Sequence, residues 1–244
     1  MRHLFAAIRF ITILPVGRSD EFDPVRMRPL FPAVGLLIGM TVAVADRLSL
    51  VFWPEPTVAL LDVLVLIAVT GALHLDGLGD TADGLYGNRP ARQALEIMKD
   101  SRIGAMGVIV ILGCLAVKWA GIAGLHAHRS LLLVLVPAYA RAAILFGIRF
   151  LPYGRPEGGT GSAFFENPIG WRDFWVLIPV IGLSFWLGWT GVVINLVFGG
   201  VVIGMLGFYR YKIGCITGDM LGALTEVSEA LLFLAASASI RSAL

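Results

Sequence analysis

Charged residues are scarce in this chain of 244 residues, at 15% of the total, whereas 57% are hydrophobic. The mean hydropathy of +0.83 is far above that of a soluble globular domain. The 2 cysteines, Cys114 and Cys215, have no CxxC spacing and no nearby histidine pair, so the sequence indicates neither a disulfide framework nor a zinc site. The basic residues form no single patch, so we expect no nucleic-acid partner.

Long apolar runs are what the chain does contain. A membrane-spanning helix needs about 20 mostly apolar residues, because hydrocarbon offers its backbone no hydrogen-bond partner. The sequence predicts an all-α fold, a polytopic integral membrane helical bundle with six or seven transmembrane helices. The candidate spans cover 30–52, 57–75, 104–124, 131–150, 173–189, 191–208 and 220–240.

The sequence shows no internal repeat, low-complexity tract or soluble appendage, so we expect one membrane-embedded domain over residues 1–244. Residues 1–29 contain an amphipathic stretch too short to cross, which indicates an interfacial segment rather than a cleavable signal. Arginine and lysine gather before the first span and in the loops that follow the second, fourth and sixth spans. By the positive-inside rule we expect these loops, including 76–103, to face the cytoplasm, and the pattern favours seven crossings with the C-terminus outside.

Three aspartates follow the second apolar run, in the stretch LHLDGLGDTADGL. On a helix of about 100° per residue, Asp76, Asp80 and Asp83 share one face. Like charges in a low-dielectric region are costly unless they take up protons or hold a cation. Oxygen ligands without cysteine favour Mg²⁺ or Mn²⁺, so we predict a metal site on this face. The alternative is a helix end whose acids are solvated or paired with nearby arginines.

Lys99, Asp100 and Arg102 alternate in charge just before the third span. The cations suit phosphate oxygens and the carboxylate suits a metal or a proton, although a basic loop that contacts lipid headgroups has the same composition. The next polar loop, rich in glycine and proline, carries Arg155 and Glu157. It suits a substrate-binding segment or an ordinary connector.

Several ionisable residues stand inside or at the edge of the predicted spans. Such side chains normally face a bundle interior or an aqueous cavity, which makes them candidates for substrate binding. They are His74, Arg141, Asp219, Glu226 and Glu229. Asp219 also suits a helix cap, and His74 also suits simple packing. Lys118 follows the same rule or extends to the membrane interface.

Five motifs occur in order along the chain: HLDGLGDTADGL, EIMKDSRIGAMG, YARA, PYGRPEGGTG and TGDMLGALTEVSE. Together they resemble the motif set of the adenosylcobinamide-GDP ribazoletransferase family, also called cobalamin synthases, with Gly79 where alanine is commoner. The resemblance runs nearly end to end. It implies a Mg²⁺-dependent enzyme of the bacterial inner membrane that joins adenosylcobinamide-GDP to α-ribazole or its 5′-phosphate and releases GMP, at the last stage of vitamin B12 assembly.

The motifs and this resemblance together give a set of expected roles. We expect Asp76, Asp80 and Asp83 to hold the metal against the diphosphate. Proton transfer from the attacking ribose hydroxyl is assigned to Asp83 or Asp100. The residues expected to contact substrate are His74, Lys99, Arg102, Arg141, Asp219, Glu226 and Glu229.

A cation-coupled secondary transporter is the competing hypothesis, since intramembrane acids also form ion pathways. Two features argue against it. The sequence shows no inverted repeat, and the acidic cluster stands at the predicted cytoplasmic boundary rather than at the bilayer midplane. The preferred acceptor, the number of metals and the oligomeric state are left open by the sequence.

Overall fold

The computed structural model describes residues 2–17, 22–155, 157–159 and 161–241. Part of the predicted interfacial segment, residues 18–21, lies outside these ranges. Within them the fold is all-helical, as predicted, apart from one isolated bridge between Tyr153 and Ile216. The α-helices are α1 (Arg2–Ile11), α2 (Pro24–Met27), α3 (Phe31–Ser49), α4 (Glu55–Thr70), α5 (Leu73–Leu85), α6 (Ala91–Ile97), α7 (Ala105–Ala123), α8 (Arg129–Phe150), α9 (Leu177–Ser184), α10 (Trp189–Lys212) and α11 (Gly218–Arg241). Short 3₁₀ turns are η1 (Arg28–Leu30), η2 (Ser162–Phe165), η3 (Trp171–Phe174) and η4 (Phe185–Leu187).

Five helical segments of the described chain are long and apolar enough to cross a membrane: Pro24–Ser49, Ala105–Ala123, Arg129–Phe150, Trp189–Lys212 and Gly218–Ala238. A sixth is present if the bent pair α4 and α5 counts as one span. The chain is therefore an integral membrane protein. The predicted span at 173–189 is wrong as a membrane-length helix, because η3, α9 and η4 divide it and its apolar part covers only Leu177–Leu187.

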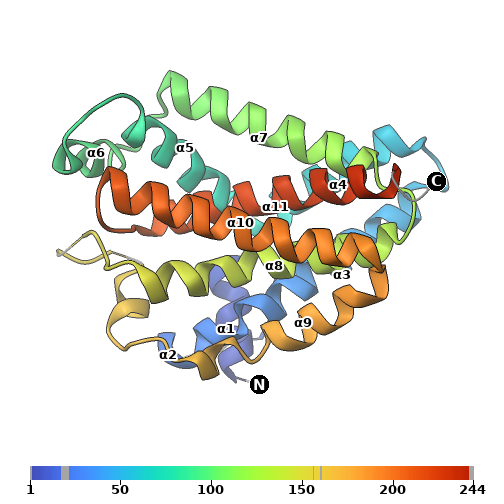
Figure 1. Cartoon of the computed structure of the whole chain (residues 1–244), viewed down its shortest axis with the longest axis horizontal. Helices are drawn as coiled ribbons and strands as arrows, with labels where there is room; N and C mark the ends of the chain where they lie inside the picture. Colours follow the sequence, from blue (N-terminus) through green and yellow to red (C-terminus); the bar gives the residue numbers. More distant parts are fainter. Residues whose placement is uncertain (1, 18–21, 156, 160, 242–244) are drawn as a thin grey trace.

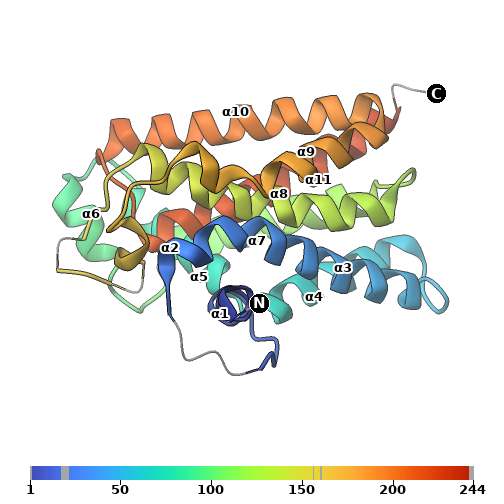
Figure 2. The same cartoon turned by 90° about the horizontal axis from the view of Figure 1, so that it is seen from below.

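The long helices lie lengthwise around α8, whereas α1 runs across them and is seen end-on in Figure 2. Helix α3 packs tightly on α8 because it presents glycine at the contact. A Cβ on Gly35 or Gly39 would lie 2.5 Å from the carbonyl oxygen of Pro137 or Leu133. The α5–α6 region, the segment after α8 and the α10–α11 turn gather at one end of the bundle, and α11 ends at the other (Figure 1).

The second predicted span does not continue into the acidic stretch. Gly71 and Ala72 adopt left-handed φ angles of 59° and 58°, and α5 leaves α4 at 92°. Glycine takes such a φ without strain, and its missing side chain leaves room for the methyl group of Ile13. The Ile13 N–H also donates to the Val69 carbonyl at 2.9 Å, so the N-terminal segment covers the break in the backbone. The acidic stretch is therefore a separate short helix.

Candidate functional site

The acidic helix α5 packs closely against the start of α11. A Cβ on Gly77 would lie 2.7 Å from the Asp219 carbonyl oxygen, and one on Gly222 would lie 3.1 Å from the His74 carbonyl oxygen. Only glycine permits this distance between the two backbones. The approach adds Asp219 to the aspartates of α5.

Four carboxylates and one guanidinium then share the site. Asp80 interacts electrostatically with Asp76, Asp83 and Asp219, which are like charges, and with Arg155, which opposes them. Arg155 forms an ion pair with Asp219 at 2.5 Å. Among the described residues, Asp76 and Asp80 take part in no ion pair. The site thus carries more negative than positive charge.

Asp83, the third aspartate of α5, is anchored to the beginning of α7. Its two carboxylate oxygens accept the backbone N–H groups of Gly104, at 2.6 Å, and Gly107, at 2.9 Å. Free N–H groups at a helix N-terminus favour a carboxylate, which serves as a cap from another helix. Asp83 therefore fixes the end of α5 against α7, in addition to any role toward a metal or a proton.

The glycine-rich segment after α8 connects three motifs at this end of the bundle. Gly154 donates its N–H to the Ile216 carbonyl at 2.9 Å, which holds the segment beside the start of α11. Arg155 reaches Asp219 and also donates to the Met98 carbonyl at 3.1 Å. Lys99 and Glu157 form an ion pair. A cavity of about 490 Å³ beside these contacts is lined by Lys99, Arg155 and Arg92 among others.

Asp100 and Arg102 form an exposed pair near the same end. The Arg102 guanidinium donates to both oxygens of Asp100, with the shortest contact at 2.5 Å. These hydrogen bonds lower the pKa of Asp100 to about 2. Both residues line a polar cavity of about 590 Å³ together with Asp83 and Arg89. Two guanidinium groups and three carboxylates therefore line this cavity, and Arg102 already donates to Asp100.

The carboxylate oxygens of the acidic site are suitable donors for a metal ion, but their positions in the structure do not form a coordination site. In the part of the chain that the structure describes, no group of three or more histidine, cysteine, aspartate or glutamate side chains has the geometry to hold a metal. The donor chemistry nevertheless fits Mg²⁺, since Asp76, Asp80 and Asp219 offer only oxygen and their charge exceeds that of Arg155. Asp76, Asp80 and Asp83 therefore lie on one helix, as predicted, but their carboxylates do not converge on one metal position.

Three of the predicted substrate-binding residues lie instead in a buried charge network. Lys118 donates to Glu226 and to Glu229, each at 2.7 Å, and Arg141 forms an ion pair with Glu229. All four side chains are at most 4% exposed. Two cations balance two anions, and these contacts join α7, α8 and α11. A role for Arg141, Glu226 and Glu229 toward substrate stays a prediction.

His74 lies between this network and the acidic site. It is 5% exposed, and its Nδ1 is buried without a hydrogen-bond partner among the described residues. It lines a cavity of about 120 Å³ together with Asp76 and Asp219. The structure therefore places His74 beside the predicted site, as the sequence led us to expect.

A further polar cluster at the opposite end of the bundle was missed by the sequence analysis. Arg129 donates to Asp46 at 2.7 Å and to Asp62 at 3.0 Å, and all three side chains are buried. Asp46 and Asp62 stand inside predicted spans, so the rule applied to Glu226 would have singled them out. The cluster joins α3, α4 and α8 and lies away from the acidic site.

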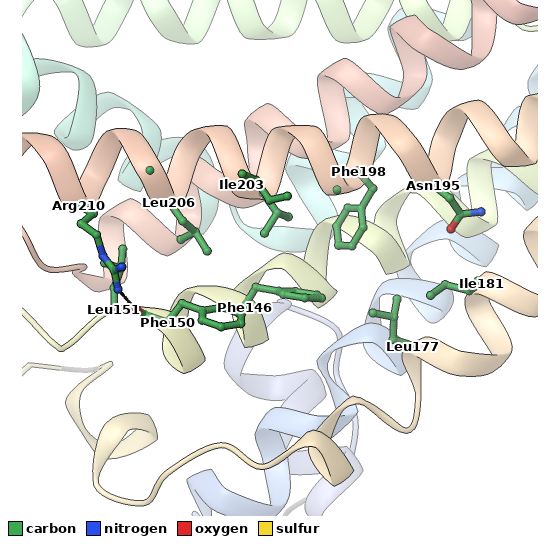
Figure 3. Close-up of a pocket in the computed structure, with 13 residues that line it drawn as sticks. Phe146, Phe150, Leu151, Leu177, Ile181, Asn195, Phe198, Ile203, Leu206 and Arg210 are labelled. Carbon is green, nitrogen blue, oxygen red and sulfur yellow. Dashed lines mark hydrogen bonds between the residues drawn. The ribbon is translucent and has the colours of Figure 1, made fainter.

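A cavity larger than those described at the acidic end lies elsewhere and is almost wholly apolar. This groove of about 660 Å³ runs between α8, α9 and α10, where Phe146, Phe198 and Leu206 extend into it (Figure 3). Asn195 and Arg210 stand at its two ends, and Arg210 donates to the Phe150 carbonyl at 3.0 Å. None of the predicted site residues lines this groove.

The fold and the site define a polytopic helical membrane protein with an acidic centre, fringed by arginine and lysine, at one end of its bundle. The family model for cobalamin-5-phosphate synthase matches residues 3–237. The chain therefore belongs to the cobalamin-5-phosphate synthase family. This confirms the family that the motifs predicted and, with it, a transferase of cobalamin biosynthesis.

Curated relatives agree with this family over nearly their whole length. A protein of Synechococcus sp. is 37% identical over 95% of this chain and 94% of its own, and one of Chlorobaculum tepidum is 37% identical over 96% and 94%. A protein of Clostridium kluyveri is 32% identical over 95% and 94%. Each is named adenosylcobinamide-GDP ribazoletransferase. No solved structure matches the chain.

Proposed function

We propose that the chain joins adenosylcobinamide-GDP to α-ribazole or its 5′-phosphate and releases GMP, at the acidic end of the bundle. The observation that carries this proposal is the junction of three distant motifs there. Asp219 of α11 lies against α5, Arg155 pairs with it, and the same arginine reaches the segment that carries Lys99. Carboxylates beside cations suit a metal-bound diphosphate.

In this proposal Asp76, Asp80 and Asp219 hold Mg²⁺ or Mn²⁺, with Asp83 on the same helix face. The excess of carboxylates over guanidinium groups around Asp80 supports the assignment. When bound, the metal would neutralise charge on the diphosphate and on the departing GMP. Asp83 is a less available metal ligand, because both of its carboxylate oxygens already accept backbone hydrogen bonds.

The cations around the acidic face have a second task, which is to hold and orient phosphate oxygens. Lys99, Arg102 and Arg155 are suited to it, since each lines a polar cavity at this end. Correct orientation places the acceptor hydroxyl in line with the bond to GMP. Of the two predicted proton acceptors, Asp100 is a weak base, because hydrogen bonds from Arg102 lower its pKa to about 2.

We further propose that this end of the bundle faces the cytoplasm of a bacterium, with the chain in the inner membrane. The loops rich in arginine and lysine gather at one end, as the positive-inside rule requires (Figure 1). Nucleotide substrates are cytoplasmic, so the site and its substrates would lie on the same side. The bilayer then surrounds the apolar flanks of the bundle.

The test is GMP release by the purified protein in liposomes, supplied with adenosylcobinamide-GDP and α-ribazole 5′-phosphate. We expect product with Mg²⁺ or Mn²⁺, none with EDTA, and recovery when the metal is restored. Asp80→Ala should lower the rate at least about 100-fold. The matched control is Glu55→Ala, an exposed acid on α4 away from the site, which should act like the parent protein. Near-normal GMP release by Asp80→Ala would contradict the metal role.

The competing transporter hypothesis makes a different prediction in the same liposomes. A transporter would move a solute across the sealed membrane without chemical change. Flux that depends on a cation gradient, together with no GMP from folded protein, would overturn the enzymatic proposal.

A further inference from the structure

The cavity beside His74 differs from the other polar cavities at this end of the bundle. Those beside α6 contain arginine or lysine, whereas this one has neither among its lining residues. Its polar side chains are His74, Asp76 and Asp219, and its remaining wall is apolar. Asp219 is paired with Arg155, but Asp76 has no ion-pair partner among the described residues, so the carboxylates of this cavity disfavour phosphate and suit a neutral or weakly basic group.

Aromatic rings supply much of the apolar wall. Phe10 comes from α1, Phe31 from α3, and Phe164 from the segment after α8. The Phe164 ring centroid lies 4.9 Å from that of Phe10 and 5.4 Å from that of Phe31. Rings held in this way form a rigid surface against which a flat heterocycle packs well. At about 120 Å³ the cavity is suited to one small ring system and excludes a corrin macrocycle.

His74 provides the specific polar group in this wall. Buried polar atoms normally have a hydrogen-bond partner, and one without a partner needs an explanation. Neither ring nitrogen of His74 has a hydrogen-bond partner among the described residues; Nδ1 is enclosed by protein, so Nε2 is the nitrogen that a ligand in the cavity can reach. A ligand with its own ring nitrogen would give Nε2 a partner.

We infer that this cavity binds the heteroaromatic base of the acceptor nucleoside, with His74 hydrogen-bonded to the base nitrogen that does not carry the ribose. The inference rests on the proposed function and assigns a subsite to one of its substrates. Base and attacking hydroxyl belong to the same nucleoside, so a base site must open beside the catalytic carboxylates. Asp76 and Asp219 meet this requirement, since they line the cavity and also belong to the acidic site.

The first experiment compares two acceptors that differ by one atom. These are the α-riboside 5′-phosphates of benzimidazole and of indole, in which carbon replaces the second ring nitrogen. We expect the parent protein to prefer benzimidazole by about tenfold in kcat/KM, the value of one good hydrogen bond. His74→Phe, which keeps a flat ring, should lose this preference. A ratio taken within one variant does not depend on how much of the protein is folded.

The second experiment reduces the cavity rather than its polarity. Ile148 of α8 lines the cavity and is 8% exposed. Ile148→Phe should lower the preference for a benzimidazole acceptor over a monocyclic imidazole acceptor at least about tenfold. Ile109→Phe, an exposed position on α7, is the matched control and should leave the ratio unchanged.

The outcomes separate this inference from the function on which it rests. GMP release with unchanged acceptor ratios in His74→Phe and Ile148→Phe would overturn the base site and leave the transferase intact. An equal loss of rate for both acceptors in Ile148→Phe would mean that the cavity is a packing gap or holds a lipid chain, which also overturns it. No GMP from the parent protein with any acceptor would contradict the proposed function and the inference with it.

Discussion

Replacement of Lys118 by methionine gives a quantitative test of the buried charge network. The lysine ammonium group donates to Glu226 and Glu229 at 2.7 Å each, and its side chain is 2% exposed. Without it, Glu229 keeps one cation, Arg141, whereas Glu226 has no ion-pair partner among the described residues. Methionine retains most of the volume, so the effect of the change is mainly the loss of charge.

The expected cost is large, because removal of one partner from a buried ion pair leaves an uncompensated charge. Such losses amount to about 3–5 kcal/mol of the free energy of unfolding. A second substitution, Glu226→Gln, removes the stranded charge. We therefore expect the double variant, Lys118→Met with Glu226→Gln, to recover at least about 2 kcal/mol of that loss.

Equilibrium unfolding in mixed micelles, with SDS as the denaturant, measures these differences. Leu112→Met is the control, since Leu112 lies on the same helix and is 61% exposed. It should change the free energy of unfolding by no more than about 0.5 kcal/mol. If Lys118→Met unfolds at the same SDS fraction as the parent, or if the double variant is no more stable than the single one, the balanced network is not what stabilises this part of the bundle.

Two further predictions concern the acidic end. At Gly77 a Cβ alone would lie 2.7 Å from the Asp219 carbonyl oxygen, so Gly77→Val should separate α5 from α11 and lower GMP release at least about tenfold. Gly113→Val is the control, because nothing lies within 4 Å of a Cβ there, and it should not lower GMP release. Equal activity of the two variants would refute the close contact. The pKa of Asp100 is lowered to about 2 by Arg102, so its charged pair is complete above the ordinary value of 3.8 and is lost only as the pH falls through about 2. We therefore expect Asp100→Asn to leave the acid limb of the pH–rate profile unchanged above about pH 5, and a displaced limb would contradict this assignment.

Helix type and the acidic face could be predicted from the sequence because both depend on local spacing. The apolar runs have membrane length, and Asp76, Asp80 and Asp83 do lie on one helix, α5. The bend before α5 could not be predicted in the same way. Gly71 ends α4 as a left-handed cap, a local device, but Ala72 takes the same left-handed angle without being glycine, and the distant residue Ile13 packs against the break. No local pattern records that contact.

The pairing of buried charges was equally beyond the sequence. Intramembrane position alone singled out Arg141, Glu226 and Glu229, but their mutual contact depends on how α7, α8 and α11 pack. Lys118 could equally have extended to the interface, and its burial is decided by two carboxylates on another helix. An ionisable residue inside a predicted membrane span is expected to have a partner, but which residue that partner is depends on the tertiary fold.

The break between α4 and α5 also constrains the order in which the chain assembles during its synthesis. The Ile13 N–H donates to Val69, and Ile13 packs on Gly71, so the first helical segment completes a structure that lies more than fifty residues further along. A ribosome makes residues 2–14 well before α4 and α5 exist. That segment can therefore dock only after the chain has been made as far as Gly71, so this contact forms after α4 has been synthesised.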